Sequence, residues 1–447
     1  MFILRNILSP LQREFGGRCN GDERGAWFVY TLLAVVTHFT SSHTASLLRC
    51  LQTLFGLQLS KRRFYTFMAS SKLPWPSLWT ALWSLIPNPT TAGRLLLALD
   101  DTINPKTGKK IFGCASFFDH AAKANQSNYP WSQNVAAIGL LKIIKGRWAW
   151  LPLAFRFYHM KKTIVAGKVK INGKAPLFQT KYAQAVEMLS KISMTFRDTP
   201  LLIITDSWFG NDGLFKPMRE VVGQHAHILS RLRVNAAMYA PPSERKENQR
   251  GRSRKYGDKI GNAASLASEF LKYAITYSVN LYGKQRDVIA FDEIVMLKTL
   301  KCAVRVVWVY RRSQWVALFT TDLDLTVGQI IEYYGARWKI EAGFKEIKQE
   351  IGSSKSQTRN PHAVTNHLNF CMMAATITWI YADHLEKTPQ RCYAANNRTH
   401  FAFSDVRKLI TQTALDKDFV TFSPDQAILH KILLSMLYCA WLLRMKM

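Results

Sequence analysis

The stretch Arg94–Thr102, "RLLLALDDT", places an uninterrupted apolar run directly before two adjacent aspartates. Because the run Leu95–Leu99 does not alternate with polar residues, it predicts a strand buried on both faces. The stretch Thr199–Asn211, "TPLLIITDSWFGN", repeats the pattern, with a predicted strand at Leu201–Ile204 followed by Asp206. Since open α/β sheets place their sites beyond the carboxyl ends of their strands, we expect these aspartates to meet there.

The remaining sequence falls into regions that differ in pattern. Mainly helical sequence precedes the first strand, and prolines between Pro74 and Pro89 separate the two. A further strand at Trp150–Met160 and a basic amphipathic helix at Lys181–Phe196 lie between the two aspartate stretches. We therefore predict an α/β fold class with five regions: a helical N-terminal region at 1–90, the first part of the core at 91–212, a β-rich insertion at 213–321, the second part of the core at 322–385 and a helical C-terminal region at 386–447.

The chain is strongly basic. Lysine and arginine number 60 against 30 aspartates and glutamates, which gives a formal net charge of +30. A surplus of this size predicts a polyanionic partner, either nucleic acid or an anionic membrane. The longest apolar runs, Trp27–Val36 and Ile432–Leu443, are too short to span a bilayer. Nucleic acid is therefore the favoured partner, and we expect no membrane association.

Cysteine usage and the first residues bear on the compartment. The seven cysteines are scattered, with no CxxC pair and no suitably spaced histidine pair. That distribution favours a reducing compartment and disfavours a zinc ribbon. The opening residues, "MFILRNILSPLQREF", lack the features of a signal peptide. We therefore expect a cytoplasmic location.

Two basic segments are candidates for contact with a nucleic acid backbone. The stretch Thr44–Ser70 predicts two helices around a turn at Gly56, with Ser60 capping a second helix that begins with Lys61, Arg62 and Arg63. This arrangement is typical of a helix-turn-helix, and equally of an ordinary helical hairpin with a solvated basic end. The second segment, residues 243–259, is a polar basic loop that either contacts phosphates or solely aids solubility; its candidate residues are Arg250, Arg252, Arg254 and Lys255.

A charged helix is predicted near residue 340, within the stretch Tyr333–Gly352, "YYGARWKIEAGFKEIKQEIG". At about 100° per residue, Tyr334, Arg337, Glu341 and Lys348 fall within a stripe of roughly 60° on one α-helix. The neighbouring stripe is apolar and predicts a core-facing side: Ile340, Phe344, Ile347 and Ile351. Taken alone, the polar stripe is equally a set of helical ion pairs.

Three carboxylates suit phosphodiester chemistry. Two magnesium ions can activate a nucleophile and stabilise the leaving oxygen, and a few convergent carboxylates suffice to hold them. Asp101, or its neighbour Asp100, and Asp206 supply two such groups at strand ends, and Glu341 can complete the set from a helix packed on the sheet. Since adjacent strand residues point to opposite faces, only one of Asp100 and Asp101 should reach the metals. Of the two we favour Asp101, with Asp100 as the alternative.

The chain resembles a known family at these residues. Tyr334-(2)-Arg337-(3)-Glu341-(6)-Lys348 fits, without gaps, the Y-(2)-R-(3)-E-(6)-K signature of one large branch of bacterial insertion-sequence DDE transposases. The stretches "LALDDT" and "IITDSWFGN" resemble the first and second catalytic-aspartate motifs of that branch, in the same order. The resemblance covers residues 95–350.

The resemblance implies a fold, an activity and roles for individual residues. It implies an RNase H-like core interrupted by a β-rich insertion between the second Asp and the Glu, an N-terminal region that binds DNA ends, and cut-and-paste transposition. The implied partners are double-stranded transposon ends and target DNA, bound by a homodimer, and the implied cofactor is Mg²⁺, as two ions, with Mn²⁺ as a substitute. Glu341 is the implied third metal ligand, and Tyr334, Arg337 and Lys348 are the implied contacts to the transposon end.

Other readings remain open at this point. Members of this branch can hold a flipped base on an aromatic side chain, for which Trp308, Trp315 and Trp338 are candidates, although each also suits core packing. A related metal-dependent nuclease would cut without joining. A catalytically inactive or domesticated relative would bind DNA as a regulator.

Overall fold

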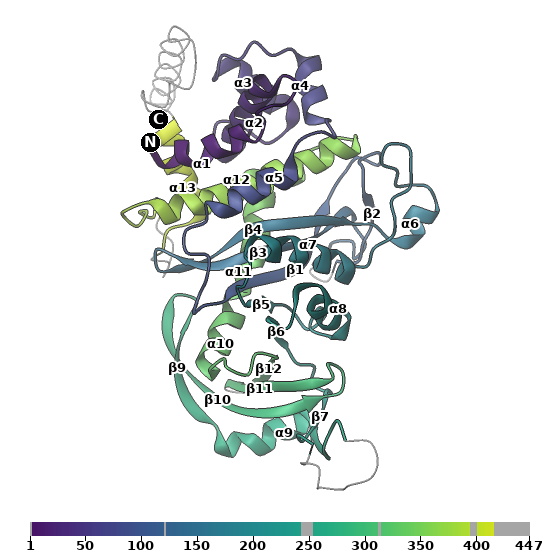
Figure 1. Ribbon diagram of the computed structural model, residues 1–447, viewed down its shortest axis with the longest axis vertical. Helices are drawn as coiled ribbons and strands as arrows, with labels where there is room; N and C mark the ends of the chain where they lie inside the picture. The colour runs from purple at the N-terminus through teal and green to yellow at the C-terminus, as the bar shows by residue number, and fades with distance from the viewer. Residues whose placement is uncertain (1, 120–121, 243–253, 312–313, 394–399, 415–447) are drawn as a thin grey trace.

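The computed structural model describes residues 2–119, 122–242, 254–311, 314–393 and 400–414. The fold is mixed α/β, built on a twisted sheet of 12 strands among the described residues. The strand order is β2-β3-β1-β5-β6-β12-β11-β10-β7-β8, with β4 paired to β3 and β9 paired to β10. In Figure 1 the helices of the N-terminal third lie at the top, and β9–β12 lie at the bottom.

The upper part of the sheet carries both predicted strands that precede aspartates. Its order is β4-β3-β1-β5-β6, in which β1, β5 and β6 run parallel and β3 runs antiparallel to both of its neighbours. The apolar residues at the start of β1 and all of β5 are fully buried, as their unbroken hydrophobic runs predict. The bounds are β1 Leu95–Pro105, β2 Cys114–Ser116, β3 Trp131–Ile144, β4 Arg147–Tyr158, β5 Leu201–Ile204 and β6 Ala226–Arg231.

Helices cover both faces of this part of the sheet. The side chain of Asp101 in β1 contacts α7, whereas the side chain of Asp100 contacts the residue at the start of α11. Since adjacent strand residues point to opposite faces, α7 and α11 lie on opposite sides of β1. The helices that pack on or beside this part of the sheet are α6 Lys161–Val165, α7 Lys181–Thr195, α8 Asp212–Val222 and α11 Trp338–Lys345.

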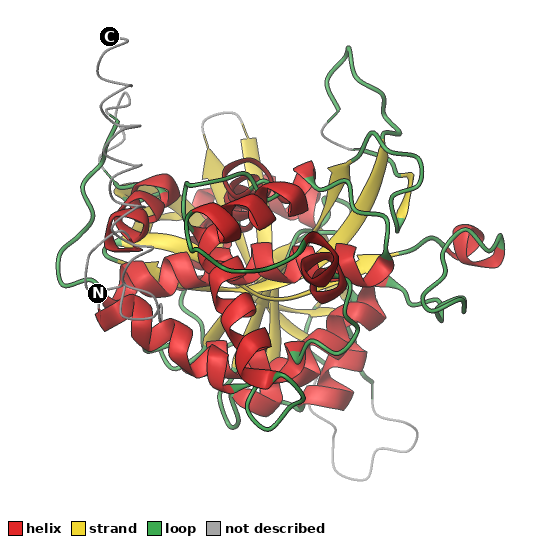
Figure 2. Ribbon diagram, turned by 90° about the horizontal axis from the view of Figure 1, so that it is seen from above, coloured by secondary structure: helices red, strands yellow, loops and turns green. Residues whose placement is uncertain are grey.

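The N-terminal helices pack around one long buried helix. α12 contacts α1, α2, α4 and α5 on one side and β3 and β4 on the other, and most of its side chains are buried. Figure 2, seen from above, shows the helices gathered over the strands. The helical character predicted for residues 1–90 is confirmed. The bounds are α1 Phe2–Arg13, α2 Gly21–Val36, α3 Thr44–Thr53, α4 Lys61–Met68, α5 Trp75–Ser84, α12 Pro361–His384 and α13 Phe403–Ala414.

The lower part of the sheet is formed by the predicted β-rich region. β12 pairs antiparallel with β6, so the sheet continues from one part to the other. The predicted boundary at residue 213 is too early, because α8 and β6 follow it and β6 lies parallel to β5. The bounds are β7 Ala237–Tyr239, β8 Lys259–Asn262, α9 Ala263–Phe270, η1 Leu271–Tyr273, β9 Ile275–Leu281, β10 Lys284–Leu297, β11 Cys302–Arg311 and β12 Gln314–Thr320.

The charged helix near residue 340 is not one regular α-helix. α10, Val327–Ala336, ends at Arg337, whose backbone N–H bonds to the carbonyl of Tyr334, three residues back. α11 follows, and the last turns, η2 Glu346–Ile351, are π-helical before the short η3 Ser353–Lys355. The predicted apolar stripe is nevertheless buried. A π-helical turn holds more residues than an α-helical one, yet Lys348 still reaches Thr102, on the face of β1 that carries Asp100.

The predicted cap and turn near Ser60 and the predicted absence of a membrane span can also be compared with the structure. Ser60 caps α4 by accepting a hydrogen bond from the backbone N–H of Arg63, and Gly56 lies between α3 and α4 with a positive φ, as expected. No helix in the described part of the chain is long and apolar enough to cross a bilayer. The apolar run Ile432–Leu443 lies outside the described residues.

Candidate active site

Parallel pairing brings together two carboxylates, one in the middle of β1 and one just beyond the end of β5. Ala98 in β1 lies opposite Ile204 in β5, and the residues two positions further along are Asp100 and Asp206. Asp206 is held by a local turn, since its Oδ1 accepts hydrogen bonds from the backbone N–H groups of Trp208 and Phe209 at 3.0 and 3.1 Å. The first steps of the prediction, a buried strand followed by an aspartate in each segment, therefore hold.

Asp100 is the more perturbed of the two adjacent aspartates. Burial, and then the negative charge of Asp206, raise the pKa of the Asp100 carboxyl to about 7. The Nη1 of Arg337 donates to Asp100 Oδ2 at 3.2 Å and partly offsets this shift. The single guanidinium therefore does not fully offset the effects of burial and of the Asp206 charge on Asp100.

Arg337 joins the third carboxylate to this pair. It is 7% exposed, and its Nη2 donates to Glu341 Oε1 at 3.0 Å, so the guanidinium bridges Asp100 and Glu341. Its Nε is buried with no hydrogen-bond partner among the described residues. Arg337 thus links Glu341 to Asp100, and the charge of Asp206 acts on Asp100 from β5.

Close packing of α11 on the sheet fixes the position of Glu341. A Cβ atom on Gly343 would lie 2.2 Å from the Trp150 ring, and one on Gly139 would lie 2.3 Å from the same indole. Trp150, which is almost fully buried, therefore fits between a strand glycine and a helix glycine. Without these two glycines, α11 could not approach β4 closely enough to bring Glu341 to the ends of the strands.

Asp101, the residue favoured from the sequence, faces the opposite side of β1. Its Oδ2 accepts hydrogen bonds from Asn134 Nδ2 at 2.8 Å and from Lys181 Nζ at 2.7 Å. The structure therefore brings Asp100, and not Asp101, to Arg337 and Glu341. The physical reason is strand alternation, which places consecutive side chains on opposite faces.

Lys348 and Tyr334 complete the polar side of this helix. Lys348 Nζ donates to Thr102 Oγ1 at 2.6 Å, on the same face of β1 as Asp100, and burial lowers the pKa of its ammonium to about 8. Tyr334 is half-buried, with its ring 5.8 Å from the guanidinium of Arg337. Burial raises the pKa of the Tyr334 phenol. Each of the four signature residues therefore lies on or beside the carboxylate cluster.

The residues present suit divalent metal ions in chemistry, although not in their current arrangement. Carboxylate oxygens are the ligands that Mg²⁺ prefers, and Asp100 is repelled by the neighbouring carboxylate of Asp206. Among the described residues, however, no group of three potential ligands is arranged as a ready metal site. Arg337 lies between Asp100 and Glu341, so its guanidinium would have to give way before those two carboxylates could share an ion.

Comparison with known families agrees with this geometry. The family model of the DDE superfamily endonucleases matches residues 20–276, more than half of the chain. The chain belongs to the DDE superfamily of endonucleases. A transposase DDE domain model also matches, at residues 180–377. The first match includes both strand-end aspartates, and the second includes Asp206 together with the helix of Glu341. A comparison with curated proteins finds no match.

As a DDE transposase, the chain is a DNA-cutting enzyme of a kind that generally depends on a divalent metal. Its predicted DNA contacts near the N-terminus have different environments. Lys61 and Arg62 are exposed at the start of α4. Arg63 instead forms an ion pair with Glu23 at 2.7 Å, with its guanidinium 5.0 Å from the Trp27 ring.

The basic loop of the transposase is described only at its end. Arg254 and Lys255 are exposed, and the guanidinium of Arg254 lies 3.8 Å from Asp258. Arg250 and Arg252 lie outside the described residues.

The three tryptophans that are candidates for holding a flipped base differ in their burial. Trp308 is fully buried, donates from Nε1 to the carbonyl of Ala263 at 3.0 Å and packs on Phe270, so of its two predicted roles the structure supports core packing. Trp315 is half-buried, and Trp338, 52% exposed, follows Arg337 directly. The prediction for Trp338 stays open.

Sequence reasoning missed an aromatic group beside the carboxylates. Trp208, 43% exposed, stacks on Tyr182 with ring centroids 4.8 Å apart, and the ammonium of Lys181 lies 5.4 Å from the Trp208 ring. The signal was present in the sequence, because Trp208 follows Asp206 by two residues and Lys181 starts the predicted helix. What the sequence did not show was that these segments meet.

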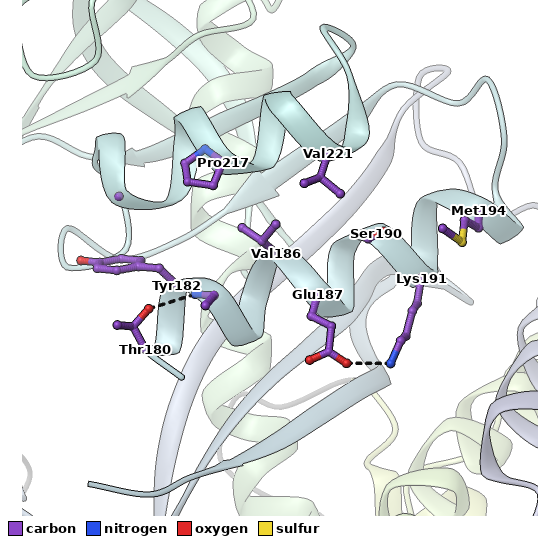
Figure 3. Close-up of a pocket in the computed structure, with 11 residues that line it drawn as sticks. Thr180, Tyr182, Val186, Glu187, Ser190, Lys191, Met194, Pro217 and Val221 are labelled. Carbon is purple, nitrogen blue, oxygen red and sulfur yellow. Dashed lines mark hydrogen bonds and ion pairs between the residues drawn. The ribbon is translucent and has the colours of Figure 1, made fainter. Parts of the chain in front are cut away.

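A hollow between α7 and α8 lies apart from the carboxylate cluster. Figure 3 shows its lining, which is mainly apolar and includes Val186, Pro217 and Val221, with the Glu187–Lys191 ion pair at one side. None of Asp100, Asp206 or Glu341 lines it. The carboxylates of Asp100, Asp206 and Glu341 therefore remain the candidate active site.

Proposed function

We propose that this transposase cuts DNA at the ends of its mobile element and joins the freed 3′-hydroxyl to target DNA. The observation that carries the proposal is the link of Asp100 to Glu341 through Arg337, with Asp206 beside Asp100. Two strands and one helix, far apart in the sequence, supply these carboxylates. Burial and the charge of Asp206 also raise the pKa of Asp100, as is common for groups at catalytic sites.

The metal ligands in this proposal are Asp100, Asp206 and Glu341, with Asp100 in place of Asp101. Divalent ions, two Mg²⁺ with Mn²⁺ as a substitute, would supply activation of the attacking oxygen and stabilisation of the leaving oxygen. Asp101 is a positioning residue on the far face, where it holds Lys181 and Asn134. Arg337 and Lys348 grip phosphates beside the scissile bond, and Tyr334 packs against Arg337 at the same place.

The finer family assignment belongs to the same proposal. In the strand order β4-β3-β1-β5-β6, β3 runs antiparallel to the other four strands. This arrangement supports an RNase H-like core. The strands β7–β12 support a β-rich insertion before the helix of Glu341, as expected for the Y-(2)-R-(3)-E-(6)-K branch. We further propose that the chain acts as a homodimer on DNA, at the nucleoid, with Lys61, Arg62, Arg254 and Lys255 among its backbone contacts.

Cleavage of labelled DNA that carries the element's own ends tests the proposal. With Mg²⁺, the natural chain should cut at the ends, and Glu341→Gln should bind the ends without cutting them. Pre-cut ends then separate joining from hydrolysis, since a nuclease that only cuts would give no joined product. End binding without cutting by either protein would contradict the proposal and favour the regulator.

A further inference from the structure

A second cationic feature lies outside the carboxylate cluster. Beyond the far end of β1, a hollow of about 670 Å³ is formed by β2, α6, the segments that flank them and the start of α12. No acidic residue lines it, and its basic lining residues come from three separate parts of the chain: Lys109, Lys110, Lys162, Lys168, Lys170 and Arg359. We call this feature the basic hollow.

The charges of the basic hollow are not neutralised within the chain. All six basic side chains are exposed, and none takes part in an ion pair with any residue that the structure describes. Elsewhere on the surface, Arg63, Lys181 and Lys301 do pair with carboxylates. Six like charges around one hollow repel each other, so a bound polyanion would be stabilised there.

Hydrogen bonds hold the walls of the basic hollow in place. Gln133 Nε2 donates to the Phe112 carbonyl at 2.8 Å, and Trp131 Nε1 donates to the Gly108 carbonyl at 3.2 Å. The buried ammonium of Lys106 donates to three backbone carbonyls within residues 353–356, just before Arg359. The basic side chains therefore project from a fixed backbone.

The sheet register relates the basic hollow to the active site. Cys114 on its floor pairs with Gln133, which in turn pairs with Asn104, four residues beyond Asp100 in β1. With about 3.4 Å per residue along a strand and about 4.8 Å between strands, the floor lies roughly 17 Å from Asp100. That distance corresponds to about five base pairs of duplex DNA.

We infer that the basic hollow binds the phosphate backbone of duplex DNA about five base pairs from the scissile position. The distance of this contact from the cut rests on the proposed function, whereas the binding of duplex DNA does not. Its aromatic lining residues, Phe112 and Trp131, are buried or half-buried, so they offer no stacking platform for the bases of a single strand. The hollow therefore holds the backbone without reading sequence.

Fluorescence anisotropy on the full chain tests the inference, with a labelled random duplex of about 40 base pairs titrated at several salt concentrations. The variant Lys109→Gln/Lys168→Gln/Lys170→Gln removes three charges of the hollow. The matched control Lys272→Gln/Lys284→Gln/Lys387→Gln removes three exposed charges elsewhere. The hollow variant should bind at least about tenfold more weakly, with a salt slope smaller by about 2 to 3, and the control should change less than about twofold.

Equal affinity of the two variants would overturn the inference, and so would an unchanged salt slope in the hollow variant. A hollow variant that loses binding to anionic vesicles but keeps its binding to the duplex would overturn it in favour of a membrane surface. A second variant, Lys162→Gln/Arg359→Gln, removes two other charges of the basic hollow and should also bind the duplex more weakly.

The distance of this contact from the cut has its own test. On DNAs with the element's ends shortened from either side of the cut, the loss should disappear once one of the two sides retains fewer than about five base pairs. Equal loss on all of these DNAs would overturn the distance of about five base pairs. If the natural chain cuts no DNA, the proposed function fails, while the random-duplex result still decides whether the hollow binds DNA.

Discussion

The two faces of β1 carry neighbouring aspartates in opposite electrostatic situations. Asp101 lies between Lys181 and Asn134, where its charge is matched. Asp100 is largely buried and is repelled by Asp206, so its pKa is raised to about 7, although it shares one buried guanidinium with Glu341. The difference teaches that a surplus of unmatched negative charge, and not the mere presence of aspartate, marks the reactive face of the strand.

The largest difference between the two faces of β1 should appear in the rate of DNA cleavage. Asp100→Asn should lower cleavage by about a thousandfold or more, because a ligand that stabilises the reacting oxygens is lost. Asp101→Asn should keep at least about a tenth of the natural rate, since its carboxylate faces α7. Single-turnover cleavage of end-labelled DNA measures both variants. The reverse ranking would show that Asp101 is the ligand and would break the comparison.

Removing the guanidinium that Asp100 and Glu341 share should destabilise the folded chain. In metal-free buffer, Arg337→Ala leaves Asp100 and Glu341 without their partner, so the free energy of unfolding should fall by about 3 kcal/mol. Arg337→Lys should lose less, because one ammonium retains part of the attraction. Urea unfolding measures the change, and millimolar Mg²⁺ should recover part of it in Arg337→Ala. Natural stability in Arg337→Ala would contradict the bridging role.

The raised pKa of Asp100 gives the same face a pH signature. The folded-state pKa of about 7 lies above the ordinary value of 3.8, so the folded chain binds more protons between these limits. The contribution of Asp100 to stability therefore falls as the pH rises from about 4 to about 7, by about 2 kcal/mol or more in metal-free buffer.

Comparison of variants isolates this pH dependence. Asp100→Asn should lack the decline, and Asp206→Asn should reduce it, because the charge of Asp206 is one of its causes. Urea unfolding at intervals of pH measures all three proteins. Parallel pH profiles for the natural chain and Asp100→Asn would show that Asp100 is not perturbed.

The far face should show an ordinary ion pair. Lys181 and Asp101 lie 2.7 Å apart, with side chains that are 17% and 22% exposed. A double-mutant cycle with Lys181→Met and Asp101→Asn should give a coupling free energy of about 1 kcal/mol, without any effect of Mg²⁺. A strong dependence of this coupling on Mg²⁺ would show that metal binds on the Asp101 face of β1, which would contradict the comparison.

Local signals in the sequence predicted much of this site. The unbroken apolar runs predicted β5 at its observed bounds and the buried start of β1, and the apolar stripe of Ile340 and Phe344 predicted the packed side of α11. The choice between Asp100 and Asp101 could not be made from the sequence, because it depends on which helix covers which face of β1. That choice is a tertiary property.

Two other features also depend on distant parts of the chain. The break at Arg337 and the π-helical turns from Glu346 to Ile351 interrupt the regular α-helix, and no capping residue or proline signals them. The basic hollow joins lysines near 109 and 168 to Arg359, so no single window of sequence contains it. Both features follow from packing, which a local pattern does not encode.

Binding of Mn²⁺ tests the central claim most directly, since the electron paramagnetic resonance signal of free Mn²⁺ falls as the ion binds. The natural chain, Asp100→Asn and Asp101→Asn would be titrated under the same conditions without DNA and with a duplex that carries the element's ends. Our account predicts that Asp101→Asn binds Mn²⁺ as the natural chain does, while Asp100→Asn binds at least about tenfold more weakly. Weakened binding in Asp101→Asn with natural binding in Asp100→Asn would contradict it.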